Sequence, residues 1–276
     1  MIGGIITLFV SSIGPYALAV ISATGNKDLP IFDMAVYFYL HFQYNGWLTQ
    51  FLIGLFIVIF ATRELMVNES LARLAFWIYF IAVFPSYLLS ILWAGLGTGV
   101  QMVAAISIVA HWISVTILLI SMKDAFKQMK HTVAKLTWFV VLLSFALLFI
   151  KTTLELGMIH PGLAELVNTT RSVIIGYLHL TLLGFISISL LVQYQLQGLT
   201  KVDRLYQTSF TIFFIGFVLN ELLLFLQALA DWTNSYTIPL YGEGLLVAAV
   251  LLGIGVVMMS FSVSTEVADR FEMDHD

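Results

Sequence analysis

The amino-acid sequence predicts an all-α protein that crosses a lipid bilayer about eight times as a helical bundle. Hydrophobic residues make up 60% of the 276 residues and charged residues only 10%, whereas soluble proteins carry about 25% charged residues. The apolar residues are gathered in stretches of about 20, the length with which a helix crosses the hydrocarbon core. The polar residues between them are too few for a soluble domain, so we expect a single transmembrane domain over residues 1–276.

Composition and motifs also exclude several function classes. The chain has no Cys, so it forms no disulfide and offers no thiolate to a metal or a substrate. Its net charge is -4, and the charged residues lie mostly in loops and the C-terminal tail, which gives no basis for nucleic-acid binding. The Gly-x-Ser-x-Gly, Gly-Lys-Ser/Thr and His-Glu-x-x-His signatures of hydrolases, phosphate-binding loops and zinc proteases are absent.

Eight apolar segments are the expected spans. They cover residues 3–21, 31–61, 74–93, 100–121, 136–158, 171–195, 206–230 and 244–264. Pro85 lies within the third span and predicts a kink. Gly95, Gly97 and Gly99 predict a tight turn between the third span and the fourth.

Residues 122–135 differ from the spans on either side of them. Lys123, Lys127 and Lys130 recur at helical spacing, and Phe126 lies on the opposite side. This pattern predicts a basic amphipathic helix that lies on the membrane surface.

The basic residues predict how the spans are oriented, because cytoplasmic loops are enriched in Lys and Arg. Nine of the 12 Lys and Arg residues lie in three of the connections and in the C-terminal tail. They are Arg63, Arg73, Lys123, Lys127, Lys130, Lys135, Lys201, Arg204 and Arg270. We therefore expect a multi-pass protein of the cell's inner or plasma membrane, with both termini and the acidic tail at residues 265–276 in the cytoplasm.

A short sequence frame occurs twice, once in the second span and once in the sixth. Residues 39–47 read Tyr-Leu-His-Phe-Gln-Tyr-Asn-Gly-Trp, and residues 177–185 read Tyr-Leu-His-Leu-Thr-Leu-Leu-Gly-Phe. Because an imidazole in hydrocarbon is costly, a His within a span is a functional-site hypothesis, and its recurrence in one frame strengthens it. Gly46 and Gly184 are more plausibly places where a neighbouring helix comes close.

The position of the repeated frame also predicts an internal duplication of four spans plus four. The halves would be residues 1–121 and 136–264, joined by the surface helix at residues 122–135. A parallel duplication makes the second and sixth spans counterparts, and membrane proteins often place a site between such repeats.

Three histidines are expected at a similar depth in the membrane. His41, His111 and His179 lie about ten, eleven and eight residues inward from the outer ends of their spans, which corresponds to about 15, 17 and 12 Å. Glu221 lies about 15 residues, or roughly 22 Å, into a span that runs the other way. The four side chains would therefore share one layer of the bilayer.

Such a layer of imidazoles suits a metal cofactor. His41 and His179 would ligate a haem iron from both sides, or share a copper ion with His111, because neutral imidazole is the commonest metal ligand. We therefore expect haem b as the cofactor and copper as the alternative or additional metal.

Four polar residues are candidates for handling protons or orienting the ligands: Glu221, Asn220, Tyr44 and Lys151. Three alternatives are open for Glu221. Without a basic partner it suits proton transfer within the membrane, bonded to a histidine it orients that ring, and paired with Lys151 it belongs to the scaffold. Lys151 and Glu155 are four residues apart, which favours a structural ion pair.

Each histidine also has a purely structural interpretation. His41, His111 and His179 would then bond to groups on neighbouring helices, as polar side chains do in membrane bundles. His160 precedes a loop proline and is expected at the membrane interface, where it could cap the site from outside. His131 lies among lysines and His275 lies in the C-terminal tail, and neither of these two is expected to be a ligand.

The two frames resemble membrane proteins of the haem-copper oxidase subunit I superfamily, most nearly its small subunit-I-like and NnrS-like members. The resemblance covers mainly the second and sixth spans and rests on residues 41–47 and 179–185. It implies haem and copper bound by intramembrane histidines, and the handling of oxygen or nitric oxide. The chain has no His-x-x-x-Tyr, no adjacent His pair and no His-x-His, and fewer spans than that family, so it resembles a reduced relative and not a full oxidase.

Three functions are therefore open. The first is a haem-binding and copper-binding membrane protein in electron transfer or in nitric oxide or oxygen handling, together with a redox partner or other membrane subunits. The second is a secondary transporter or proton-coupled carrier with a His and Glu site at the membrane midplane. The third is an assembly or scaffold subunit without a cofactor, whose imidazoles bond to neighbouring side chains.

Overall fold

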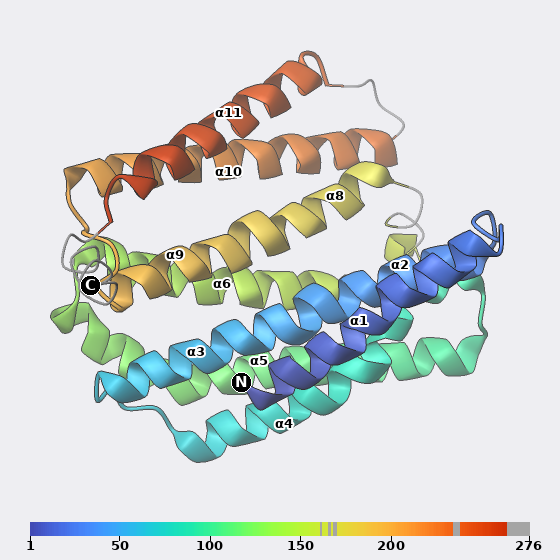
Figure 1. Ribbon diagram of the computed structural model, residues 1–276, viewed down its shortest axis with the longest axis horizontal. Coiled ribbons are helices and arrows are strands. Elements are labelled where there is room, and N and C mark those ends of the chain that lie inside the picture. Colours follow the sequence, from blue (N-terminus) through green and yellow to red (C-terminus); the bar gives the residue numbers. More distant parts are fainter. Residues whose placement is uncertain (161, 165–166, 168–169, 234–237, 264–276) are drawn as a thin grey trace, which may run out of the picture. The chain divides into compact units, whose positions relative to one another are not determined.

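The computed structural model of the chain is all α-helical, as predicted (Figure 1). It describes residues 1–160, 162–164, 167, 170–233 and 238–263, so the predicted acidic tail at residues 265–276 lies outside the described part. Within that part, 8 helical segments are long and apolar enough to cross a membrane. They are Ile2–Ala23, Pro30–Thr62, Glu69–Ala94, Thr98–Thr132, Lys135–Gly157, Arg171–Leu196, Arg204–Trp232 and Tyr241–Ser260.

The chain divides into two compact units, and each is described by itself. Unit 1 comprises residues 1–128 and 145–168, and unit 2 comprises residues 129–144 and 169–276. Two helices, α5 (Thr98–Thr132) and α6 (Lys135–Gly157), contribute residues to both units. The compact units therefore do not coincide with the predicted sequence halves, because α6 is divided between them.

The surface helix predicted for residues 122–135 is not a separate element. Helix α5 continues without a break to Thr132, and α6 begins at Lys135. The amphipathic pattern itself is present, since Lys123 is exposed whereas Met122 and Ala125 are fully buried. Residues 122–132 thus form the C-terminal part of α5, with one buried stripe and one lysine face.

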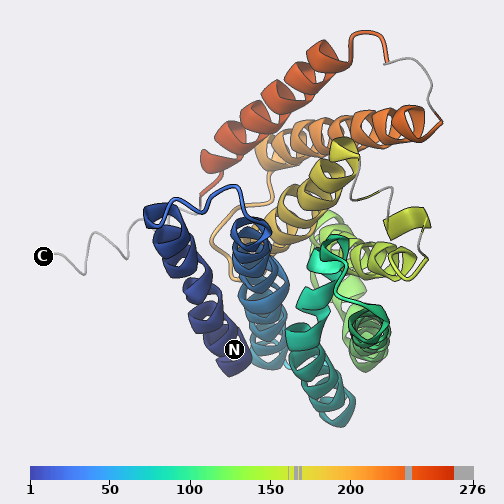
Figure 2. The same ribbon diagram turned by 90° about the vertical axis from the view of Figure 1, so that its right-hand side faces the viewer.

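In unit 1 the first span lies along the second (Figure 1 and Figure 2). The elements are α1 (Ile2–Ala23), α2 (Pro30–Leu40), the π-helix η1 (His41–Leu48) and α3 (Thr49–Thr62). Glycines permit this close approach: a Cβ at Gly14 would lie 2.6 Å from Tyr39 Cβ, and one at Gly46 would lie 2.9 Å from Thr7 Cβ. The prediction that Gly46 admits a neighbouring helix is confirmed.

The third span of unit 1 is irregular at its end. Helix α4 (Glu69–Ser86) changes to the 3-10 helix η2 (Tyr87–Ala94) directly after Pro85 and Ser86, and Ile91 has a non-helical φ of -122°. Proline in a helix removes a backbone donor and favours such a disruption. The turn that follows uses a positive φ at Gly95 and Gly97, so the irregular helix and the glycine turn agree with the predictions.

Unit 2 has the same sequence of element types around its repeated frame. Its elements are α8 (Arg171–His179), the π-helix η3 (Leu180–Ile186), α9 (Ser187–Leu196), α10 (Arg204–Trp232) and α11 (Tyr241–Ser260). Helix α11 lies along α10 in both views (Figure 1 and Figure 2). A Cβ at Gly216 would lie 2.9 Å from the Ala248 carbonyl oxygen, and one at Gly255 would lie 2.7 Å from the Phe213 nitrogen.

Both copies of the repeated frame therefore contain a π-helix at the same place. One begins at His41 and the other at Leu180, directly after His179. A π-helical segment inside an α-helix is rare and occurs frequently at functional sites. The similarity that the sequence shows between the two frames thus extends to their backbone.

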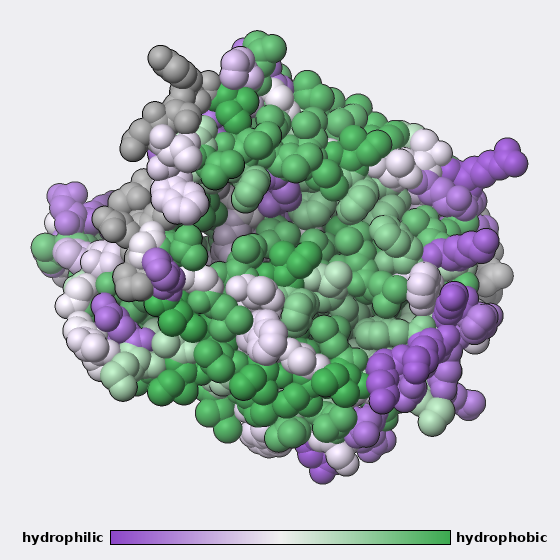
Figure 3. Space-filling model, turned by 180° about the vertical axis from the view of Figure 1, so that it is seen from behind, coloured by the Kyte–Doolittle hydropathy of each residue, from purple (hydrophilic) through white to green (hydrophobic). Residues whose placement is uncertain are grey.

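The helices expose the side chains expected of a protein that contacts lipid. Phe9, Ile81 and Phe225 are 72%, 65% and 64% exposed, and hydrophobic residues cover much of the face in Figure 3. In water this much exposed apolar surface would favour association. In a bilayer the same side chains contact acyl chains, which agrees with the expectation of lipid contact.

Two glycines of α11 provide a matched test of its packing against α10. Gly255→Ala should lower the stability by about 1–3 kcal/mol, because its Cβ would meet the backbone of α10. Gly253→Ala should cause no loss, since nothing lies within 4 Å of that position and Ala favours helix. Thermal unfolding of the purified protein in detergent measures both, and equal melting temperatures for the two variants would contradict the packing described.

Candidate functional site

His41 is held on both ring nitrogens within unit 1. The side chain is 3% exposed, and its Nε2 lies 2.9 Å from the Val83 carbonyl oxygen and 3.3 Å from Ser86 Oγ. Its Nδ1 lies 3.3 Å from Asn45 Nδ2. A neutral imidazole that donates from Nε2 to Val83 and accepts on Nδ1 satisfies this arrangement. His41 thus has the partners that the structural interpretation predicts, although the main partner is a backbone carbonyl.

His111 has a different environment in the same unit. It is 2% exposed, and its ring stacks on Tyr79 with centroids 4.3 Å apart and 12° between the planes. Its Nε2 is buried, with no hydrogen-bond partner in the described part of the chain. An unsatisfied buried polar atom costs about 1–3 kcal/mol. This nitrogen is therefore a place where the folded chain offers a bond to something else.

Two residues link the two histidines of unit 1. Tyr79 stacks on His111 and donates its hydroxyl to the Asn45 carbonyl at 2.9 Å, and the Asn45 side chain contacts His41. The sequence analysis did not single out Tyr79 or Asn45. The spacing of four residues from His41 could have indicated Asn45, whereas Tyr79 comes from another helix and has no comparable signal.

The ion pair predicted between Lys151 and Glu155 is confirmed and is buried. Lys151 Nζ lies 2.7 Å from Glu155 Oε1, and the side chains are 1% and 8% exposed. Both charges lie close enough to act electrostatically on His41 and His111. We call His41, Asn45, Tyr79, Ser86, His111, Lys151 and Glu155 the unit 1 polar cluster.

Tyr44, a predicted member of the site, lies in η1 and is 8% exposed. Its carbonyl accepts a hydrogen bond of 2.6 Å from Thr49 Oγ1, five residues later. The wider spacing of a π-helix leaves carbonyls available at this separation. The contact that is seen for Tyr44 therefore stabilises the π-helix.

In unit 2, three predicted site residues form a chain of hydrogen bonds. Asn220 Nδ2 lies 2.8 Å from His179 Nδ1 and 3.2 Å from Glu221 Oε1. Asn220 is 6% exposed, and His179 and Glu221 are half-buried. The frame histidine His179 directly precedes its π-helix η3 and bonds to the next span, α10, just as His41 bonds to α4.

The alternatives left open for Glu221 can now be compared with its contacts. Lys151 pairs with Glu155 in unit 1, and Glu221 forms no ion pair within the described residues of unit 2. It reaches His179 through the Asn220 amide. Among the described residues of its unit, Glu221 thus has no basic partner, and it contacts His179 only through Asn220.

His160 and His131 take no part in the polar contacts described above, and His275 lies outside the described residues. His160 is exposed after the end of α6, and His131 is exposed near the end of α5. No group of three or more His, Cys, Asp or Glu side chains in the described part of the chain is arranged to hold a metal ion.

Comparison of the chain with protein-family models, curated proteins and solved structures found no match. The resemblance to the haem-copper superfamily therefore rests on the two histidine frames. Function has to be argued from the residues of the two sites.

The buried ion pair provides the next prediction. Lys151→Met should lower the stability by about 3–5 kcal/mol, because it leaves Glu155 buried without its cation. The double variant Lys151→Met/Glu155→Met should recover most of this loss, since it removes both charges. The free energy of unfolding of the wild type, the single variant and the double variant is measured by intrinsic fluorescence.

The exposed pair of Lys127 and Asp124, whose side chains are 77% and 50% exposed, is the matched control. Lys127→Met should change the stability by no more than about 1 kcal/mol. A Lys151→Met variant as stable as the Lys127→Met variant would show that the Lys151 and Glu155 charges are not buried.

Proposed function

We propose that the chain is an integral membrane haem-binding protein that works in electron transfer or in the handling of nitric oxide or oxygen. The observation that carries this proposal is the buried, unpaired Nε2 of His111. A neutral imidazole nitrogen is a good axial ligand for haem iron. A ligand at this atom would also remove the cost of leaving it unsatisfied in hydrocarbon.

His179 supports the same proposal in unit 2. Metal-ligating histidines are almost always held through their second ring nitrogen by a carboxylate, a carbonyl or another polar group. Asn220 Nδ2 lies 2.8 Å from His179 Nδ1 and 3.2 Å from Glu221 Oε1. A metal at Nε2 would require the amide to turn so that Oδ1 accepts the hydrogen of Nδ1, and the amide would then give up its donation to Glu221.

His41 fits the role of an axial ligand less well than the sequence analysis expects. Its Nε2 contacts the Val83 carbonyl and its Nδ1 contacts Asn45, so a bond to iron would break one of these contacts. We therefore assign the ligand role in unit 1 to His111 and that in unit 2 to His179, each by its own surroundings, and we assign to His41 the role of holding η1 against α4.

The proposal retains the location and the partners that the sequence predicts. A bound haem would supply a one-electron couple or a binding site for a diatomic gas. The protein would lie in the inner or plasma membrane, with both termini in the cytoplasm as its basic loops predict. A redox protein or another membrane subunit would exchange electrons with it.

Absorption spectroscopy of protein purified from haem-replete cells tests this function. We expect a Soret band and sharp bands after reduction with dithionite, a positive pyridine haemochrome assay, and loss of these signals in His111→Ala or His179→Ala. His131→Ala, at an exposed position, is the control and should keep the spectrum. His41→Ala should keep the haem and lower the melting temperature.

A colourless protein that contains no haem would overturn the proposal. Bands that disappear only in His41→Ala would show that His41, and not His111, is a ligand. Metal analysis of the same samples tests for copper.

A proton-coupled carrier is the second candidate, and Glu221 favours it. A carboxyl within a span that has no basic partner is typical of proton pathways in transporters. The contacts of Glu221 to Asn220, and of Asn220 to His179, join it to an imidazole, which is a second group that can bind a proton.

Proton entry into liposomes tests the carrier. With an imposed membrane potential and an internal pH-sensitive dye, the wild type should take up protons and Glu221→Gln should lose this uptake. Glu243→Gln, at an exposed position, should behave as the wild type. Equal uptake by both variants, or none by the wild type, would reject the carrier function.

A further inference from the structure

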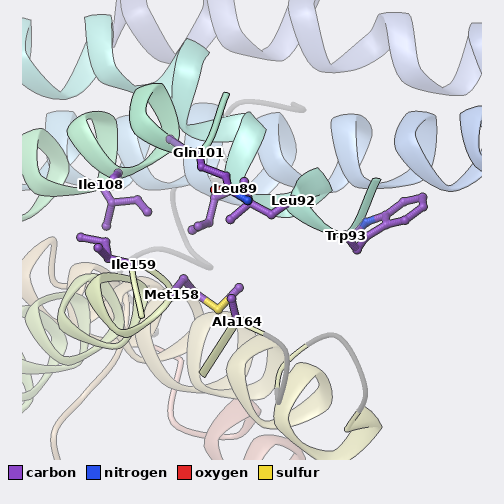
Figure 4. A pocket seen from close by; sticks show the side chains of 10 residues that line it. Leu89, Leu92, Trp93, Gln101, Ile108, Met158, Ile159 and Ala164 are labelled. Atoms are coloured by element: carbon purple, nitrogen blue, oxygen red, sulfur yellow. The ribbon is translucent and has the colours of Figure 1, made fainter. Parts of the chain in front are cut away.

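A cavity of about 390 Å³ lies within unit 1 near the ends of three helices (Figure 4). Its wall is formed by η2, by the first turns of α5 and by residues that follow α6. The lining residues are Leu89, Leu92, Trp93, Gln101, Ala104, Ala105, Ile108, Met158, Ile159 and Ala164. In Figure 4, Leu89 and Leu92 lie across the cavity from Met158 and Ala164, and Ile108 and Ile159 lie together at one end.

The local structure explains why this space exists. The 3-10 geometry of η2 and the non-helical Ile91 turn the end of the third span out of a regular α-helix. On the facing helix, the cavity is lined by the small side chains of Ala104 and Ala105. Protein interiors otherwise leave few voids larger than a water molecule.

The lining determines what can fill the cavity. Nine of the ten described lining residues have hydrocarbon, aromatic or thioether side chains, which favour contact with an apolar molecule. Among these described residues Gln101 has the amide side chain, and the Trp93 indole already donates to the Ser90 carbonyl at 3.0 Å. The volume lies in the range of small-molecule sites, about 300–1,000 Å³.

We propose that this cavity is a binding site for a lipid-soluble molecule with a hydrocarbon body and one carbonyl oxygen. The hydrocarbon body packs between η2 and the segment that follows α6, and the Gln101 amide donates to the carbonyl. Both an ester-linked acyl chain of a membrane lipid and a free lipid-soluble carbonyl compound have this chemistry. The proposal does not depend on haem binding.

The inner end of the site lies beside the unit 1 polar cluster. Ile108 lines the cavity three residues before His111, and Ala104 lines it seven residues before. At 100° per residue these three positions share one face of α5. Helical side chains lean toward the N-terminus, so the His111 ring leans toward the turn that lines the cavity.

Photolabelling with two diazirine probes tests the site in the full-length protein. One probe is a phosphatidylcholine with the diazirine in its acyl chain, incorporated in nanodiscs, and the other is a free alkyl benzoquinone that carries the same group. Mass spectrometry of the labelled peptides should place the label on Leu92, Trp93 or Met158. Labelling by the first probe alone identifies a bound lipid, and labelling by the second alone identifies a free carbonyl compound.

Variants that fill the cavity provide the decisive comparison. Ala105→Phe should reduce labelling of the lining residues at least fivefold, whereas Ala61→Phe, an equal substitution at an exposed position, should not change it. Ala104→Leu is a second filling variant in case Ala105→Phe is not monodisperse. Label spread evenly over the lipid-facing residues, or lining labels that persist in the filling variants, would overturn the proposal.

Gln101→Leu tests the carbonyl contact separately. The loss of one hydrogen bond of about 1 kcal/mol corresponds to about fivefold weaker binding of the benzoquinone probe. This binding is measured by how well the unreacted benzoquinone competes with labelling of the cavity residues. An all-hydrocarbon diazirine probe should label wild type and Gln101→Leu equally. If Gln101→Leu loses labelling by both probes equally, the substitution collapses the cavity. If the benzoquinone competes as well with the variant as with the wild type, Gln101 does not donate to the carbonyl.

Discussion

Within a bilayer each polar group has to find its partner inside the protein, because hydrocarbon offers no hydrogen bonds. This constraint explains the helical fold and also the positions of the polar side chains. His41 bonds to the Val83 carbonyl, Lys151 to Glu155, and Asn220 contacts both His179 and Glu221. Removal of one partner leaves the other unsatisfied, which is why the two sites are expected to be sensitive to single substitutions.

The repeated frames meet this constraint with a shared local structure. In each, a π-helix begins at or directly after the histidine, and the imidazole contacts the following span of its own half. The partners differ, since His41 contacts a backbone carbonyl and His179 contacts an amide backed by a carboxyl group. The same local backbone thus carries a histidine bonded on both ring nitrogens in one frame and a histidine in a polar chain in the other.

Two features of unit 1 support the proposals: a buried nitrogen atom and a cavity. The Nε2 of His111 is a buried polar atom without a partner in the described part of the chain, and the cavity beside η2 is lined mostly by hydrophobic side chains. A metal ion or a hydrogen-bond donor would satisfy the lone pair of the His111 nitrogen. A molecule that is mostly hydrocarbon would suit the lining of the cavity. The two features lie on one face of α5, one helical turn apart.

Properties that depend on local sequence were predictable. Hydropathy identified the spans, Pro85 the irregular helix, and the four-residue spacing the pair of Lys151 and Glu155. Tertiary structure alone decided which groups meet: His41 finds Val83, 42 residues away, and Tyr79 stacks on His111. It also made residues 122–132 part of α5 and divided α6 between two units. Local patterns specify helices because a helix satisfies its own backbone, whereas partners on different helices depend on packing that no single segment encodes.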